Sequence, residues 1–158
     1  MTRIKAEASA ALAVSPAAAY SVIADYRRGH PLIVPKPYFS DLQVQRGGVG
    51  AGTEISFRMR TFGVTRTLQA SITEPEPGRR LVETYADGSE TTFLVEPAAA
   101  TAGQARVTIT TEYDRPGVQG WVEARLVPSL LRRVYAAELA NLERVARTWP
   151  EGGDPSRV

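Results

Sequence analysis

Residues 126–149 constrain the fold most, because they predict a long amphipathic helix after a chain that otherwise reads as strands. At 100° per residue, the apolar side chains of this stretch fall within one arc and most charged ones on the opposite side. The apolar set is Val127, Leu131, Val134, Tyr135, Leu142, Val145 and Trp149. Pro128 predicts a kink or a new start of the helix. Such a helix has to pack its apolar side against another layer.

Glu138 is the exception within this helix, because it falls near the middle of the apolar arc. An unpartnered buried carboxylate is costly, so this position requires a cation, a hydrogen-bond donor or a cavity. We predict that Glu138 is buried and hydrogen-bonded, with Arg66 as the first partner to consider and Tyr113 or Tyr85 as the neutral alternatives. Polar groups that point inward beneath a helix lying across a sheet indicate a cavity that could hold a small molecule.

The rest of the chain predicts strands joined by turns. Residues 3–14 alternate as a half-buried strand, and Ser15-Pro16 opens a helix through Asp25. A second short turn is expected at 32–34. Turn signals then separate the later strands, which are expected to start at Leu42 and to cover 53–61, 64–73, 80–86, 90–96 and 106–114. The predicted class is α+β: a curved antiparallel sheet of about seven strands, two short helices after the first strand, and the long helix.

Composition narrows the class of protein. With 158 residues, one domain over 1–149 is expected, followed by a flexible tail over 150–158. The chain has no cysteine, which excludes disulfides and thiolate chemistry. It contains no signal-peptide pattern and no apolar run long enough to span a bilayer, so we expect a cytoplasmic protein without stable membrane insertion. The net charge is only +2 and the arginines are scattered, which disfavours nucleic-acid binding. The oligomeric state stays open.

Three local motifs, in this order, carry a resemblance to a known superfamily. They are the stretch Val14-Ser15-Pro16-Ala17-Ala18-Ala19-Tyr20-Ser21-Val22-Ile23-Ala24-Asp25, the segment Gly50-Ala51-Gly52-Thr53 entering a strand, and Glu138-Leu139-Ala140-Asn141-Leu142 on the helix. This arrangement resembles the helix-grip fold of the START-like, polyketide cyclase/dehydrase and lipid-transport (SRPBCC) superfamily, over residues up to about 149. The resemblance implies a deep, mostly apolar cavity between the sheet and the last helix. It implies no shared catalytic motif.

Strand alternation predicts which side chains line that cavity. The expected ligand-binding residues are Phe57, Met59, Arg66, Leu68, Tyr85, Phe93, Thr111, Tyr113 and Glu138. Arg66 is notable because it interrupts the apolar face between Val64 and Leu68. Glu83 is ambiguous, since Val82 and Ala86 compete with it to face inward. Arg66, Glu138 and Glu83 could pair around a polar ligand group, or form a structural salt bridge.

His30 is the only histidine, in a Gly-His-Pro loop that the resemblance places near the cavity entrance, together with Leu32 and Ile33. A gate residue and an ordinary loop residue are both open readings of His30. No metal site is expected, because the acids lack ligand spacing, and no cofactor is expected. The glycines of residues 47–52 precede a strand rather than a helix, so turn geometry explains them better than phosphate binding.

Three functions remain open from the sequence. The leading one is non-enzymatic binding of a small, largely hydrophobic molecule such as a lipid, a polyketide or a quinone-like compound. The second is a cyclase- or dehydratase-like enzyme, which would need Tyr113, His30 or Glu138 as an acid or base near the substrate. The third is a protein-interaction module with a collapsed cavity.

Overall fold

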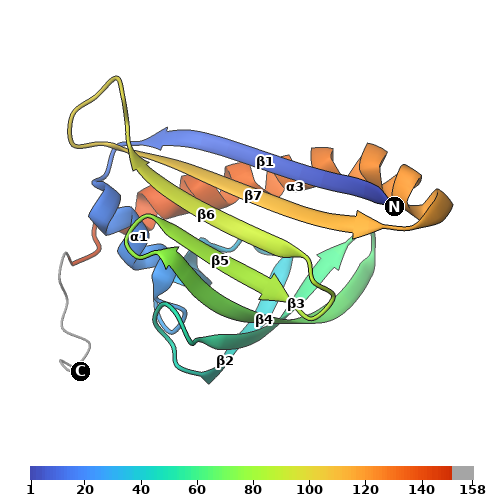
Figure 1. The fold of residues 1–158 in the computed structure, drawn as a ribbon. Coiled ribbons are helices and arrows are strands. Elements are labelled where there is room, and N and C mark those ends of the chain that lie inside the picture. Colours follow the sequence, from blue (N-terminus) through green and yellow to red (C-terminus); the bar gives the residue numbers. More distant parts are fainter. Residues whose placement is uncertain (151–158) are drawn as a thin grey trace.

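The computed structural model describes residues 1–150, in which a long helix lies along a curved sheet (Figure 1). The elements in chain order are β1 (Thr2–Leu12), α1 (Pro16–Ala24), α2 (His30–Ile33), β2 (Phe39–Arg46), β3 (Glu54–Thr61), β4 (Val64–Glu76), β5 (Arg80–Tyr85), β6 (Glu90–Pro97), β7 (Ala105–Arg115) and α3 (Gly117–Ala146). The predicted α+β class and helix-grip arrangement are confirmed. The predicted tail lies, apart from Pro150, outside the described residues.

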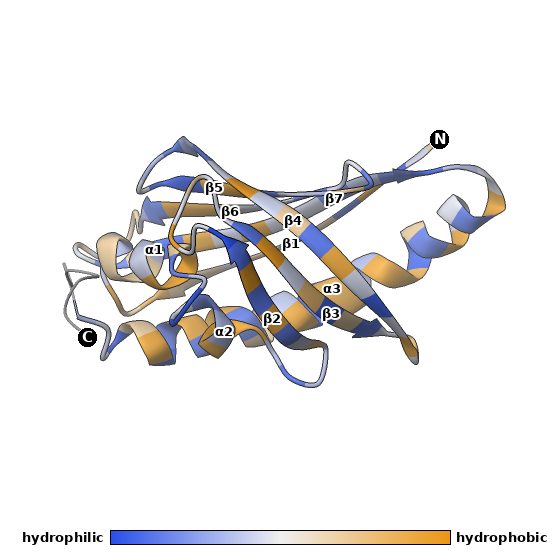
Figure 2. Ribbon diagram, turned by 90° about the horizontal axis from the view of Figure 1, so that it is seen from below, coloured by the Kyte–Doolittle hydropathy of each residue, from blue (hydrophilic) through white to orange (hydrophobic). Residues whose placement is uncertain are grey.

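The sheet is antiparallel throughout, with seven strands in the order β1-β7-β6-β5-β4-β3-β2. Because β1 pairs with β7, the first and last strands are neighbours, and the hairpins fill the rest of the sheet. Alternate residues face the helix, as the sequence predicts: Ile55 and Phe57 of β3 are buried, while Glu54 and Arg58 are exposed. In Figure 2, hydrophobic and hydrophilic residues alternate along the strands.

Local signals explain the two short helices. The Ser15 side chain accepts a hydrogen bond from the backbone N–H of Ala18 at 3.1 Å, and Pro16 occupies the first turn of α1. The glycine segment between β2 and β3 then joins α1 to the sheet, because Tyr26 N donates to Gly48 O at 2.9 Å. Gly50 has a φ of +64°, and an added Cβ would lie 2.4 Å from Glu74 Oε2. These glycines therefore serve turn geometry and close packing, as expected.

Helix α3 begins at Gly117 and continues through Pro128 as one element. The expectation of a new helix start at Pro128 is therefore wrong. From Leu131 onward the helix packs its predicted apolar arc into the core, with Val134, Leu139 and Leu142 almost fully buried. Asn141 Nδ2 also donates to Ile33 O at 3.0 Å and joins α3 to α2. Within residues 1–150, no helix combines the length and apolarity required to cross a bilayer.

Candidate functional site

A cavity of about 580 Å³ lies between the sheet, α2 and α3. It is lined by all the residues that the sequence analysis assigns to ligand binding: Phe57, Met59, Arg66, Leu68, Tyr85, Phe93, Thr111, Tyr113 and Glu138. These side chains share the cavity because the inward positions of β3 to β7 fall on one face of the curved sheet. The cavity is open, so the structure does not support a collapsed interaction module.

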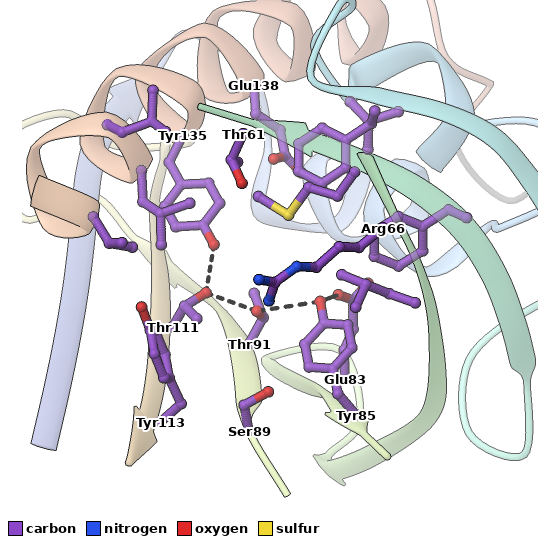
Figure 3. A pocket seen from close by; sticks show the side chains of 18 of the residues that line it. Thr61, Arg66, Glu83, Tyr85, Ser89, Thr91, Thr111, Tyr113, Tyr135 and Glu138 are labelled. Carbon is purple, nitrogen blue, oxygen red and sulfur yellow. Dashed lines mark hydrogen bonds between the residues drawn. The ribbon is translucent and has the colours of Figure 1, made fainter. Parts of the chain in front are cut away.

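A continuous row of hydroxyl groups crosses one wall of the cavity (Figure 3). Tyr135 of α3 shares a hydrogen bond with Thr111 of β7, and Thr111 Oγ1 lies 2.7 Å from Thr91 Oγ1 of β6. The Tyr85 hydroxyl of β5 lies 3.3 Å from Thr91 Oγ1 and donates to Glu83 Oε2 at 2.7 Å. The row gives an otherwise apolar cavity one polar wall.

Glu83 ends this row at the inner end of the cavity, which we define by Tyr26, His30, Glu83, Phe93 and Glu138. The Tyr26 hydroxyl donates to Glu83 Oε1 at 2.7 Å, so both carboxylate oxygens of Glu83 accept a tyrosine hydrogen bond. These bonds satisfy a carboxyl group that is buried in the protein interior. Burial and the Glu83 charge raise the pKa of both tyrosines well above its ordinary value, so each keeps its proton.

His30 lies behind Glu83 and is only 3% exposed. Its Nδ1 is 2.8 Å from Ile23 O, and because a carbonyl only accepts, Nδ1 carries the hydrogen. Its Nε2 lies 3.6 Å from Glu83 Oε1, and its ring stacks on Tyr26 with the centroids 4.3 Å apart. Burial lowers the pKa of His30, against the opposing effects of Glu83 and the Ile23 carbonyl. The ring is therefore neutral near neutral pH.

Glu138 is 2% exposed, lines the cavity, and forms no hydrogen bond or ion pair with any residue in the described part of the chain. Burial, followed by repulsion from Glu83, raises the pKa of its carboxyl well above the ordinary value of 4.5. The prediction that Glu138 is buried is confirmed. The prediction that it is hydrogen-bonded within the protein is wrong, because its carboxyl faces open space in the cavity.

The structure also rejects the expected pairing of Arg66 with Glu138. Arg66 lines the cavity from β4 but is exposed, and it takes part in none of the ion pairs within residues 1–150. Figure 3 shows its guanidinium pointing into the cavity. The pairing fails because Arg66 lies near the open end of β4, next to the β3–β4 turn, whereas Glu138 lies far along α3. Both charged groups remain available to a ligand.

The predicted entrance residues do not form an entrance. His30 lines the buried inner end, the side chain of Ile33 is fully buried, and Leu32 is exposed without lining the cavity. The reason is that residues 30–33 form α2, which packs against α3 and covers the inner end rather than a free loop. The exposed apolar lining residues instead lie at the other end, which we call the mouth: Phe62, Val64, Val122 and Leu126.

The sequence analysis missed several polar residues of the site. Glu83 is inward, with Leu81 and Tyr85, so the ambiguous register of β5 is resolved in favour of this face. Tyr135 belongs to the predicted apolar arc of the helix, but nothing in the sequence indicates that its hydroxyl meets those of Thr111 and Thr91. Tyr26 follows α1 and was not singled out. Only the pairing of β5, β6 and β7 brings these groups together. No group of three metal-ligating side chains occurs among residues 1–150.

The family model described as "Polyketide cyclase / dehydrase and lipid transport" matches residues 3–147. The chain belongs to this family. The match covers every strand and helix that builds the cavity, and it agrees with a fold made to hold hydrophobic ligands. No curated protein matches the chain significantly.

Solved structures of other family-like proteins share the fold. The KanY protein has 27% sequence identity and a TM-score of 0.79, covering 93% of this chain and 99% of that chain. The Zhui aromatase/cyclase from Streptomyces sp. R1128 has 14% identity and a TM-score of 0.69, covering 96% and 99%. Norcoclaurine synthase from Thalictrum flavum has 13% identity and a TM-score of 0.68, covering 92% and 95%. At these identities the last two matches establish the fold alone.

Proposed function

We propose that this protein binds a small, largely apolar molecule with oxygen substituents in the cavity. The observation that carries the proposal is an open cavity of about 580 Å³ that combines aromatic walls with a buried carboxyl group, Glu138, without a protein partner. Burying such a group without a partner costs stability, so its retention favours a role toward a ligand. We also expect the protein to act in the cytoplasm.

The polar wall narrows the class of ligand. Thr91, Thr111 and Tyr135 present hydroxyls along one side, and Arg66 supplies a cation toward the open end. Phe57, Phe93 and the other apolar lining residues surround the rest of the space. A plain acyl chain would offer no hydrogen-bonding partner to the buried Glu138 carboxyl, which has none within residues 1–150. A polyketide-like or quinone-like molecule, with oxygens on an apolar ring system, matches both parts of the lining better.

A binding assay tests the proposal with the uncharged apolar fluorophore N-phenylnaphthylamine. Met59→Trp puts an indole into the cavity, and we expect it to weaken probe binding at least about tenfold, as overfilling of a pocket does. Leu32→Trp adds the same ring at an exposed position that does not line the cavity, and it should leave binding unchanged. Equal probe affinity in both variants would show that the probe binds elsewhere.

Glu138→Gln tests whether the carboxyl group orients the ligand. A role in bracing the fold is disfavoured, since the group has no protein partner within residues 1–150. For a co-purified ligand identified by native mass spectrometry, we expect the substitution to cost about 1.5–3 kcal/mol of binding free energy, the range for hydrogen bonds to charged groups. If Glu138→Gln left ligand affinity unchanged and lowered the free energy of unfolding, the carboxyl group would serve the fold and not the ligand.

A cyclase- or dehydratase-like activity is the second candidate, and one observation favours it. Because burial and Glu83 raise the pKa of Glu138, this carboxyl keeps its proton to a higher pH than an ordinary carboxyl does, which is the property required of a general acid inside an apolar site. Tyr113 is a weaker candidate, since its hydroxyl donates to Glu123 Oε2 at 3.1 Å and its pKa is raised by burial. Turnover of a polyketide-like substrate that is lost in Glu138→Gln, with binding retained, would establish catalysis.

A further inference from the structure

The mouth of the cavity carries apolar side chains that the fold does not explain. Phe62 is 62% exposed at the tip of the β3–β4 hairpin, and Trp121 and Val118 on the first turns of α3 are 59% and 79% exposed. Val64, Val122 and Leu126 are exposed beside them. The hairpin and the start of α3 lie at the same end of the molecule in both views (Figures 1 and 2). Exposed large side chains gathered in this way indicate a contact surface.

Phe62 is the most unusual of these residues. Its φ is +50°, and that of Gly63 is +76°, so both central residues of the hairpin turn are left-handed. Such turns strongly favour Asn, Asp or Gly at the first of these positions. Phenylalanine strains the backbone there and buries little of its ring within the protein. The turn therefore holds an aromatic ring outward, at a position where folding alone favours a small polar residue.

The same two elements concentrate positive charge. Residues 58–66 and 117–126 together contain four arginines and one acidic residue, Glu123, a net charge of +3. The whole chain carries +2, so all other residues together carry −1. Glu123 is paired with Arg115, with Oε2 3.4 Å from Nε, and Arg58 is paired with Asp41 at 3.2 Å. Arg60, Arg66 and Arg125 form no ion pair within residues 1–150. The guanidinium of Arg125 lies 4.8 Å from the ring centre of Trp121, which joins cation and aromatic ring in one unit.

We infer that the mouth docks peripherally on an anionic lipid membrane, with Phe62 and Trp121 inserted at the interface and arginines such as Arg60 and Arg125 near the lipid phosphates. Exposed aromatic rings on two projecting elements, flanked by arginines, have the composition that favours the membrane–water interface. The absence of a spanning helix in residues 1–150 is compatible with binding at the surface. This docking does not depend on the proposed ligand. If the proposed function is also correct, the cavity opens toward the bilayer.

Vesicle co-sedimentation tests the inference with the full chain. We expect binding to phosphatidylcholine vesicles that contain about one third phosphatidylglycerol, and much weaker binding to phosphatidylcholine alone. The double variant Phe62→Asn and Trp121→Ser should reduce the partition coefficient at least about tenfold, as loss of two buried aromatic side chains predicts. Asn suits the left-handed turn, so this variant should fold. The control Leu32→Ser and Val49→Ser alters two exposed apolar residues outside the cavity lining and should bind like the wild type.

Charge is tested separately. Arg60→Glu with Arg125→Glu should weaken binding by more than about fivefold for each arginine lost, and added salt should weaken the wild type as well. Arg106→Glu with Arg144→Glu makes the same charge change at exposed positions on β7 and late in α3, and should have a much smaller effect. In a Trp149→Phe background, the emission of Trp121 should shift to shorter wavelength on vesicle binding.

Two outcomes would overturn the inference. One is no vesicle binding at either lipid composition, or binding that the control variants weaken as much as the mouth variants. The other is self-association in analytical ultracentrifugation that disappears in the Phe62→Asn and Trp121→Ser variant while vesicles are not bound. That result would assign the mouth to an interface between two copies of the chain. Neither outcome bears on probe binding by the cavity, so the proposed function is tested independently.

Discussion

The two ends of the cavity are built from the same helix and the same sheet, but the inner end is buried and the mouth is exposed. At the inner end, α3 packs Leu139 and Leu142 into the core, and each buried polar group except Glu138 has a protein partner. At the mouth, the same helix exposes Trp121 and Leu126. Arg60, Arg66 and Arg125 have no acidic partner there within residues 1–150, in contrast to Arg58 and Arg115. The inner end therefore contributes to stability, whereas the mouth retains apolar and charged surface that folding does not need.

The largest contrast is expected for core truncation at the two ends of α3. Leu142→Ala should lower the free energy of unfolding by about 2–5 kcal/mol, since the side chain is almost fully buried. Leu126→Ala, the same truncation at the mouth, should change it by less than about 0.5 kcal/mol. Urea denaturation measures both. Similar losses of unfolding free energy in the two variants would show that Leu126 also contributes to the core. The contrast between the two ends of α3 would then be wrong.

Hydrogen bonds should show a smaller contrast in the same direction. Tyr26→Phe removes the donor to Glu83 Oε1 in the buried inner end, and should cost about 1–3 kcal/mol of stability. Tyr113→Phe removes the donor to Glu123 near the mouth, where Arg115 also serves Glu123, and should cost less than about 1 kcal/mol. If the two losses were equal, burial at the inner end would not strengthen its polar network.

Glu138 should make stability depend on pH. Its folded pKa is raised above the ordinary 4.5, so between that pH and the folded pKa the native state holds a proton that the unfolded chain has lost. Stability should therefore fall as pH rises through this window, by at most about 1.4 kcal/mol per pH unit. Glu138→Gln should remove this slope and be at least as stable at pH above neutral. Glu123→Gln, at the half-exposed mouth, is the control and should leave the slope in place.

The sequence predicted the apolar framework well because its signals are local. Alternation in β3 and β7 and the helical arc of α3 identify which residues face inward, and that was enough to place every predicted ligand residue in the cavity lining. Partners could not be predicted in this way. Arg66 and Glu138 both line the cavity, yet their distance depends on the curvature of the sheet and on how α3 crosses it.

His30 illustrates the same limit at the inner end. A Gly-His-Pro segment predicts an exposed loop, but the residues form α2 beneath α3, and His30 bonds the Ile23 carbonyl in the core. Phe62 illustrates it at the mouth, where a hairpin signal predicted the turn without revealing that the ring is 62% exposed beside the cavity. In both cases tertiary packing decides exposure, and the local pattern carries no information about it.

The two methionines offer the most direct test of ligand binding in the cavity. Met59 lines the cavity, whereas Met1 is 90% exposed, so the chain contains one reporter and one internal control. With isotope-labelled methionine methyl groups, titration with N-phenylnaphthylamine should shift the Met59 resonance in a saturable manner and leave the Met1 resonance unmoved. A Met59 resonance that stays in place at probe concentrations that saturate the fluorescence signal would contradict binding in the cavity.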